Sequence, residues 1–75
     1  MSILPALTAV QTIRALKRGG FVEDRQKGSH LILINPTTKV RTVVPIHSGK
    51  TIAKPLLKDI INDADLSIEQ FLDLL

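Results

Sequence analysis

Three runs of strand-forming residues follow one another through the middle of the chain, separated only by short turns. They span 21–26, 30–35 and 40–45, and the second and third are rich in branched aliphatic residues. A short turn can join only antiparallel neighbours, because a parallel pair needs a crossover of about a dozen residues or more. We therefore expect a three-stranded antiparallel meander in which each strand pairs with the next.

Helical patterns flank this predicted sheet in the sequence. The first helix is capped by Thr8, in a capping box with Gln11, and it stops at Gly19-Gly20. The second begins near Lys54-Pro55, because proline fits a first helical turn. A short third helix begins at Ser67, in a capping box with Gln70. The order is α-β-β-β-α-α, which predicts an α+β fold with helices on one face of the sheet. The expected apolar stripes are Ala9, Val10, Ile13 and Leu16 in the first helix, and Leu56, Leu57, Ile60, Ile61 and Ala64 in the second.

The strand expected at 30–35 is apolar on both of its faces. Alternation places Leu31 and Leu33 on one face, and Ile32 and Ile34 with His30 on the other. A sheet that is covered on one side usually alternates apolar with polar residues. Either a bulge breaks the alternation, or the second face packs against something else, and we favour a partner surface.

Length and composition bound the possible architectures. The chain has 75 residues, of which 44% are apolar and 23% charged, so we expect one globular domain over residues 1–75. A core of this size gives modest stability, which a partner would increase, and a homodimer is one option. The aromatic residues are Phe21 and Phe71 alone, which argues against the base-stacking platforms of single-strand binders.

Several classes of site are excluded by residue content. The chain has no cysteine, and its two histidines have no carboxylate at ligand spacing, so we expect no metal and no cofactor. The start, from Met1 to Pro5, has no basic region and no long apolar run, so we expect no signal peptide. No stretch reaches the roughly 20 apolar residues that span a bilayer. The expected location is the cytoplasm, without a membrane contact.

Positive charge is concentrated in the earlier part of the chain. All ten lysines and arginines lie at or before Lys58, where only Glu23 and Asp24 are acidic. This asymmetry indicates an anionic partner, with nucleic acid as the obvious candidate, although solubility alone is a competing explanation. The bases considered for such contacts are Arg14, Lys17, Arg18, Lys27, Lys50, Lys54 and Lys58.

The hexapeptide Arg25-Gln26-Lys27-Gly28-Ser29-His30 concentrates polar chemistry in the first strand-to-strand turn. An imidazole titrates near a pH of about 6.5, so His30 can accept or donate a proton. Arg25 and Lys27 can stabilise the negative charge that builds on a phosphate under attack. The backbone around Gly28 and Ser29 can approach an anion closely. The competing interpretation is a plain hairpin corner with a half-exposed histidine.

A second histidine, His47, leaves the third strand where His30 enters the second. Because these strands run antiparallel, we expect both imidazoles at one edge of the sheet, where His47 is a candidate acid. A loop histidine that contacts only backbone is the alternative. Lys50, Lys54 and Lys58 follow, and lysines at a helix start can track a phosphate backbone.

Four segments of the chain, in this order, resemble the HicA (YcfA-like) toxin family. They read LKRGGF at 16–21, RQKGSH at 25–30, VVPIHSGK at 43–50 and ADLSIEQFL at 64–72. The resemblance implies a fold like the double-stranded-RNA-binding domain, with helices on one face of a three-stranded sheet. It also implies a toxin that cleaves mRNA, paired in a type II system with a HicB-like antitoxin that holds it inactive. The active histidine of the family falls on His30.

Residues and resemblance together predict a metal-independent endoribonuclease. His30 is the expected general base on a ribose 2′-hydroxyl, with Lys27 and Arg25 stabilising the phosphate. The acid is unassigned, His47 being a candidate only. Two alternatives from other classes are an RNA-binding module without catalysis and a protein-interaction subunit. The expected substrate-binding residues are Arg25, Lys27, Gly28, Ser29, His47, Lys50, Lys54 and Lys58.

Overall fold

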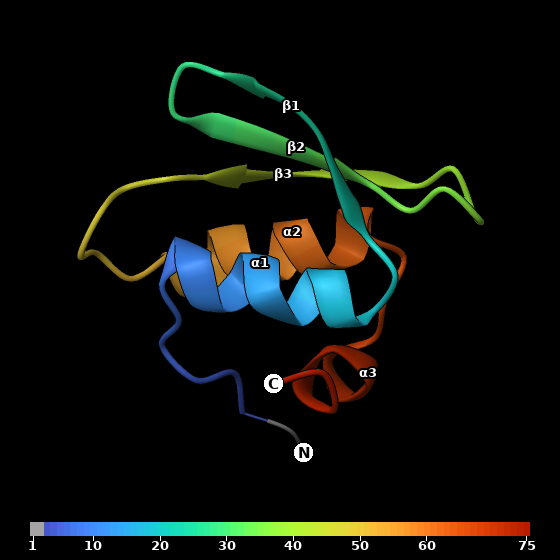
Figure 1. Ribbon diagram of the computed structural model, residues 1–75. Coiled ribbons are helices and arrows are strands. Elements are labelled where there is room, and N and C mark those ends of the chain that lie inside the picture. The colour runs from blue at the N-terminus through green and yellow to red at the C-terminus, as the bar shows by residue number, and fades with distance from the viewer. Residues whose placement is uncertain (1–2) are drawn as a thin grey trace.

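The computed structural model describes residues 3–75, which form a small sheet with helices on one side (Figure 1). The elements are α1 (Ala9–Arg18), β1 (Val22–Lys27), β2 (His30–Ile34), β3 (Arg41–Pro45), α2 (Lys54–Asp63) and α3 (Ile68–Leu72). This order and the open antiparallel sheet confirm the predicted α+β class and are consistent with a fold like the double-stranded-RNA-binding domain. None of the helices within 3–75 has the length and apolar character needed to cross a membrane.

The sheet has the order β1-β2-β3, with each strand antiparallel to the next. In this register His30 lies opposite Lys27 on one side and opposite Pro45 on the other. The pairing of β1 with β2 shifts between Glu23 and Arg25. The irregularity therefore lies in β1, and the alternation of β2 is intact.

The two faces of β2 have different surroundings. Leu31 and Leu33 are buried toward the helices, whereas Ile32 and Ile34 are half-buried on the opposite face. Figure 1 shows the described helices below the sheet and none above it. The second apolar face is thus left without a helical cover.

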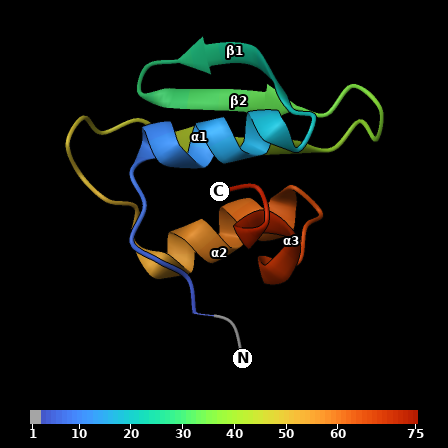
Figure 2. The ribbon, with the colours of Figure 1, turned by 60° about the horizontal axis from the view of Figure 1, so that its bottom comes forward.

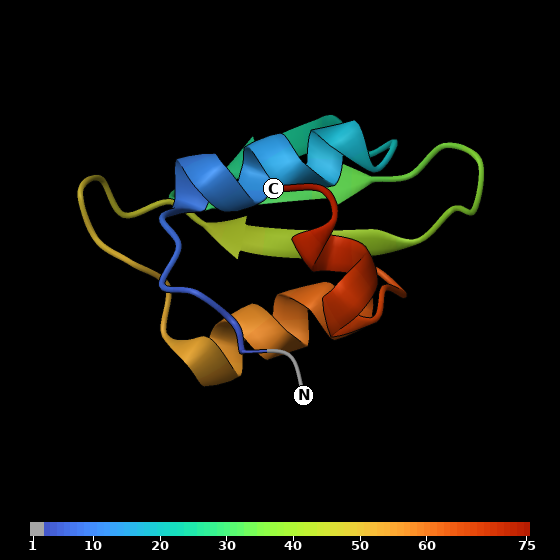
Figure 3. The same cartoon turned by 90° about the horizontal axis from the view of Figure 1, so that it is seen from below.

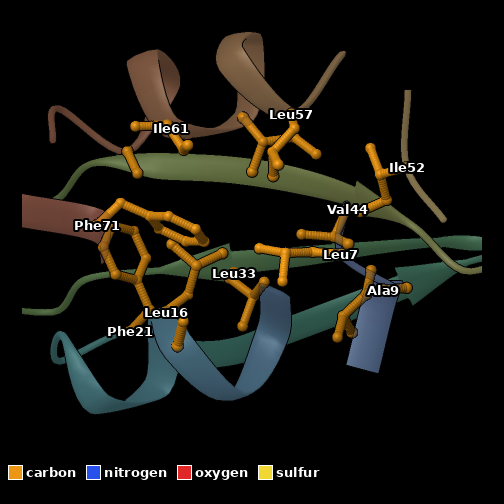
Figure 4. Packing of buried hydrophobic residues seen from close by; sticks show 14 of the residues in the cluster. Leu7, Ala9, Leu16, Phe21, Leu33, Val44, Ile52, Leu57, Ile61 and Phe71 are labelled. Atoms are coloured by element: carbon orange, nitrogen blue, oxygen red, sulfur yellow. The ribbon is translucent and has the colours of Figure 1, made fainter. Parts of the chain in front are cut away.

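The hydrophobic core lies between the helices and the lower face of the sheet (Figure 4). Its most enclosed side chains come from five different parts of the chain, and each such burial stabilises the fold by about 1.5–3 kcal/mol. The side chains with no exposed surface include Leu16, Leu33, Val44, Leu57 and Phe71.

Two residues of the predicted helical stripes lie outside the core. Val10 is 60% exposed and Leu56 is 40% exposed, so their assignment to the buried faces is wrong. Each directly precedes or follows a buried position, and consecutive helical residues are turned by about 100° from one another. The buried face of α1 instead includes Thr12, whose hydroxyl donates a hydrogen bond to the carbonyl oxygen of Thr8 at 2.9 Å.

Thr42 links the sheet to α2 through a buried polar contact. Its side chain is 1% exposed, and its hydroxyl donates a hydrogen bond of 2.9 Å to the carbonyl oxygen of Ile60. That carbonyl also accepts the backbone N–H of Ala64 at 3.1 Å. The hydroxyl is therefore satisfied inside the core, and it fixes β3 against α2.

Replacement of Thr42 by Val should lower the free energy of unfolding by about 0.5–1.5 kcal/mol, because a methyl group of similar size cannot donate this hydrogen bond. Denaturant unfolding of both proteins would measure the difference. The matched control is Thr37→Val in the exposed β2–β3 turn, where a change of less than about 0.5 kcal/mol is expected. Equal effects at both positions would show that the bond to α2 contributes nothing.

Candidate functional site

The segments that carry most of the predicted site residues meet at one end of the molecule. Figures 1 and 2 show the β1–β2 turn, the loop from β3 to α2, and the first turns of α1 and α2 at this end. The β2–β3 turn lies at the opposite end. The topology of the meander therefore gathers residues that are distant in the sequence.

The β1–β2 turn is tight and is held by its own side chains. Gly28 adopts a φ of 57°, a left-handed conformation that disfavours any residue with a Cβ. Nε2 of Gln26 donates a hydrogen bond of 3.1 Å to the carbonyl oxygen of Gly28. This turn places His30 as the first residue of β2.

His30 lies on the face of the sheet that no described helix covers. Cross-strand partners share a face, so Lys27 stands beside His30, and Arg25 stands beside Ile32 one step along the same face. All three polar side chains are exposed. Within residues 3–75 none of them has a hydrogen bond or an ion pair through its side chain. They are therefore accessible to a ligand.

The loop from β3 to α2 is anchored at both of its ends. The backbone N–H of Ile46 donates to the carbonyl oxygen of Ser29 at 2.6 Å, and that of Ile52 donates to the carbonyl oxygen of Leu7 at 2.7 Å. Between these anchors, the N–H of Lys50 donates to the carbonyl oxygen of His47 at 3.1 Å. His47 is exposed and lies two residues beyond Pro45, the partner of His30. The structure thus brings the two imidazoles to the same end of the sheet, as the topology predicts.

The three later lysines differ in how near they lie to this end. Lys50 is exposed in the anchored loop, and Lys54 is exposed at the first position of α2. Lys58 lies one turn farther along α2, which runs away beneath the sheet (Figure 3). The structure gathers the first two with the histidines and leaves Lys58 at the margin.

The start of α2 is a feature that sequence reasoning missed. Its N-cap residue is Ala53, which makes no side-chain hydrogen bond to the first turn, and that turn has no acidic residue. Uncapped N–H groups at a helix N-terminus attract anions. The signal in the sequence is an alanine before Lys54-Pro55, where Ser, Thr or Asp would cap the helix.

Charge at this end is one-sided. No acidic residue occurs between Arg25 and Lys58, and Glu23 at the start of β1 is paired with Lys17 of α1. An exposed imidazole beside two cations can take a proton from a hydroxyl while the cations offset charge on a phosphate. Within residues 3–75 no three His, Asp or Glu side chains gather closely enough to hold a metal ion.

Comparison with known families identifies the chain. A family described as the HicA toxin of bacterial toxin–antitoxin systems matches residues 11–66, which are 56 of the 75 residues. This span includes the three strands, α2, nearly all of α1, and every predicted site residue. A search of curated proteins gave no match. The resemblance read from the sequence is confirmed, and the chain belongs to the HicA family of toxins in bacterial toxin–antitoxin systems.

Proposed function

We propose that this toxin is a cytoplasmic endoribonuclease that cleaves mRNA, with residues 1–75 acting as a single HicA-like domain. The observation that carries the proposal is the exposed His30 beside Lys27 and Arg25 on an uncovered sheet face. The open surface suits a polymeric substrate, and the absence of acids from Arg25 to Lys58 suits a polyanion.

In the proposed mechanism His30 is the general base. The neutral imidazole takes the proton of a ribose 2′-hydroxyl, and the resulting oxygen attacks the adjacent phosphorus. A new bond from that oxygen to phosphorus forms as the bond to the 5′-oxygen breaks, which leaves a cyclic phosphate. Lys27 and Arg25 offset the negative charge that builds on the phosphate oxygens. The departing oxygen needs a proton, and His47, at the same end of the sheet, is the candidate donor.

The remaining substrate contacts hold the RNA backbone. The backbone of the turn at Gly28 and Ser29 approaches the scissile phosphate. Lys50 and Lys54 bind neighbouring phosphates, supported by the uncapped start of α2. Lys58 extends this contact by one helical turn. No metal ion takes part in these steps.

We propose that a HicB-type antitoxin inactivates the toxin by covering the upper face of the sheet. Ile32 and Ile34 are half-buried there, Val43 is 43% exposed, and His30 lies on the same face. Apolar side chains rimmed by charged ones mark protein contact surfaces. A partner seated on Ile32 and Ile34 would also block access to His30.

The His30→Ala variant should lose RNA cleavage by about 10²- to 10⁴-fold, the range for removal of a positioned general base. Its melting temperature should stay close to that of the parent, because an exposed side chain contributes little packing. Cleavage of a labelled mRNA in buffer with a chelator measures the loss. The variant should still retain RNA on a filter, which separates lost chemistry from lost binding. Cleavage at the parental rate would make this chain a binding module without the proposed chemistry.

Charge reversal at Lys54 and Lys58 should weaken binding to all RNA sequences alike, because phosphate contacts carry no sequence information. The slope of log affinity against log salt should fall by roughly 0.7 per lost contact with single strands. The matched control is Lys39→Glu in the β2–β3 turn at the opposite end (Figure 1), for which we expect an unchanged slope. The His30→Ala background keeps the RNA intact. An affinity independent of salt would contradict phosphate binding.

Replacement of both Ile32 and Ile34 by Thr should weaken the complex with the antitoxin by tenfold or more, because apolar burial contributes about 25 cal/mol per Å². The circular dichroism spectrum of the free toxin should be unchanged. Titration calorimetry measures the affinity, with Leu56→Thr on α2 as the exposed apolar control. Unfolding of the double variant would show that these side chains belong to the core.

A further inference from the structure

A hollow of about 190 Å³ opens between the first turn of α1 and the loop from β3 to α2. Ala9, Val10 and Ile46 give it apolar walls. Ser48 and His47 also line it and carry polar groups, whereas the hydroxyl of Thr8, another lining residue, is hydrogen-bonded to Gln11 in the capping box. The hollow is therefore mainly apolar, with the polar side chains of Ser48 and His47 among its lining residues.

The walls of this hollow are fixed by backbone hydrogen bonds. The N–H of Ile46 is bonded to the carbonyl oxygen of Ser29, the residue before His30. At the other end of the loop, Thr8 and Thr51 form an isolated antiparallel bridge. The capping box of α1 holds the first helical turn on the opposite wall. The hollow is thus formed before any ligand arrives, and one of its walls is bonded directly to the β1–β2 turn.

Val10 is one of several large apolar residues that lie outside the core, together with Ile3, Val22, Val43, Leu56 and Leu75. It is 60% exposed at the start of α1, although an aliphatic side chain gains nothing from contact with water. It also lines a second hollow farther along α1, together with Ile13, Arg14 and Lys17. Val10 therefore borders both hollows. Arg14 lines the second hollow, and Lys50 directly follows Gly49, which lines the first.

We propose that the hollow at Val10 and Ile46 holds one unpaired nucleobase of the RNA, close to the scissile phosphate. This inference rests on the proposed ribonuclease function and adds to it a base-binding subsite. The volume lies below the range of about 300–1,000 Å³ typical of drug-sized ligands, and it suits a single flat heterocycle. Apolar walls accept the faces of such a ring, while hydroxyl and imidazole groups meet its edge.

The rest of the chain favours this mode of binding over stacking on an aromatic ring. Phe21 and Phe71 are the two aromatic residues, and both are buried in the core. In place of aromatic stacking, a hollow lined by aliphatic side chains can shelter a base from water. A base can enter the hollow only when it is unpaired, so the subsite selects single-stranded RNA. The cations on both sides of Val10 suit the phosphates before and after the bound nucleotide.

The test uses the His30→Ala protein, which leaves RNA intact, and a short single-stranded RNA with 2′-O-methyl groups. Methyl resonances of Val10 and Ile46 should shift on titration, while those of Val22, which is exposed on β1 at the end of the sheet away from the β1–β2 turn, should not. Replacing one nucleotide at a time by an abasic one should lower affinity about tenfold at one position, within the range for a sheltered base. In the additional variant Val10→Gln, the abasic replacement at that position should change affinity less than twofold. In the control variant Val22→Gln the tenfold loss should persist.

Each other outcome overturns the proposal in a distinguishable way. RNA binding with silent Val10 and Ile46 methyl groups, and equal affinity for every abasic RNA, would refute the subsite while the ribonuclease function stands. Absence of any RNA binding would contradict both the base-binding subsite and the ribonuclease function. Shifts at Val10 and Ile46 on addition of the antitoxin but not of RNA would assign the hollow to the protein partner.

Discussion

The packing of Leu33 and Val44 against the two long helices is the contact on which the rest of the structure depends. Both side chains have no exposed surface, and they come from adjacent strands at the centre of the core (Figure 4). The buried Thr42 hydroxyl adds a directional bond to α2 at the same interface. A sheet of three short strands cannot bury both faces with helices that all lie on one side. Its upper face therefore stays open, and it is the face that carries His30.

The same constraint sets the geometry of the proposed site. A meander brings the start of β2 and the end of β3 together, so the β1–β2 turn and the His47 loop share one end without any long-range bridge. The bond between Ile46 and Ser29 then couples the two segments directly. Placement of the imidazoles by main-chain ladders, and not by flexible side chains, is the kind of support that catalytic groups need.

Much of the fold could be predicted because the sequence signals that decide it are local. The capping boxes at Thr8 and Ser67 form as the sequence predicts, and the meander follows from its short turns. The exposure of Val10 could not be predicted. Where two apolar residues are adjacent at the edge of a helical stripe, the sequence does not indicate which of them faces the core. The hollow escaped prediction for a related reason, since its walls come from segments that meet only in three dimensions.

The exposure of β1, the outer strand of the sheet, has a further consequence for the local stability of the toxin and its resistance to proteases. Every residue of β1 is exposed, so this strand is held by its ladder to β2, by the Lys17–Glu23 ion pair and by the buried Phe21 before it. Segments with few buried contacts open at a lower free energy than the core that supports them. The strand β1, which leads into the β1–β2 turn, can therefore fray while Leu33 and Val44 stay packed. Within the sheet, slow amide exchange would be confined to β2 and β3, and a protease could sever β1 from a domain that is otherwise intact.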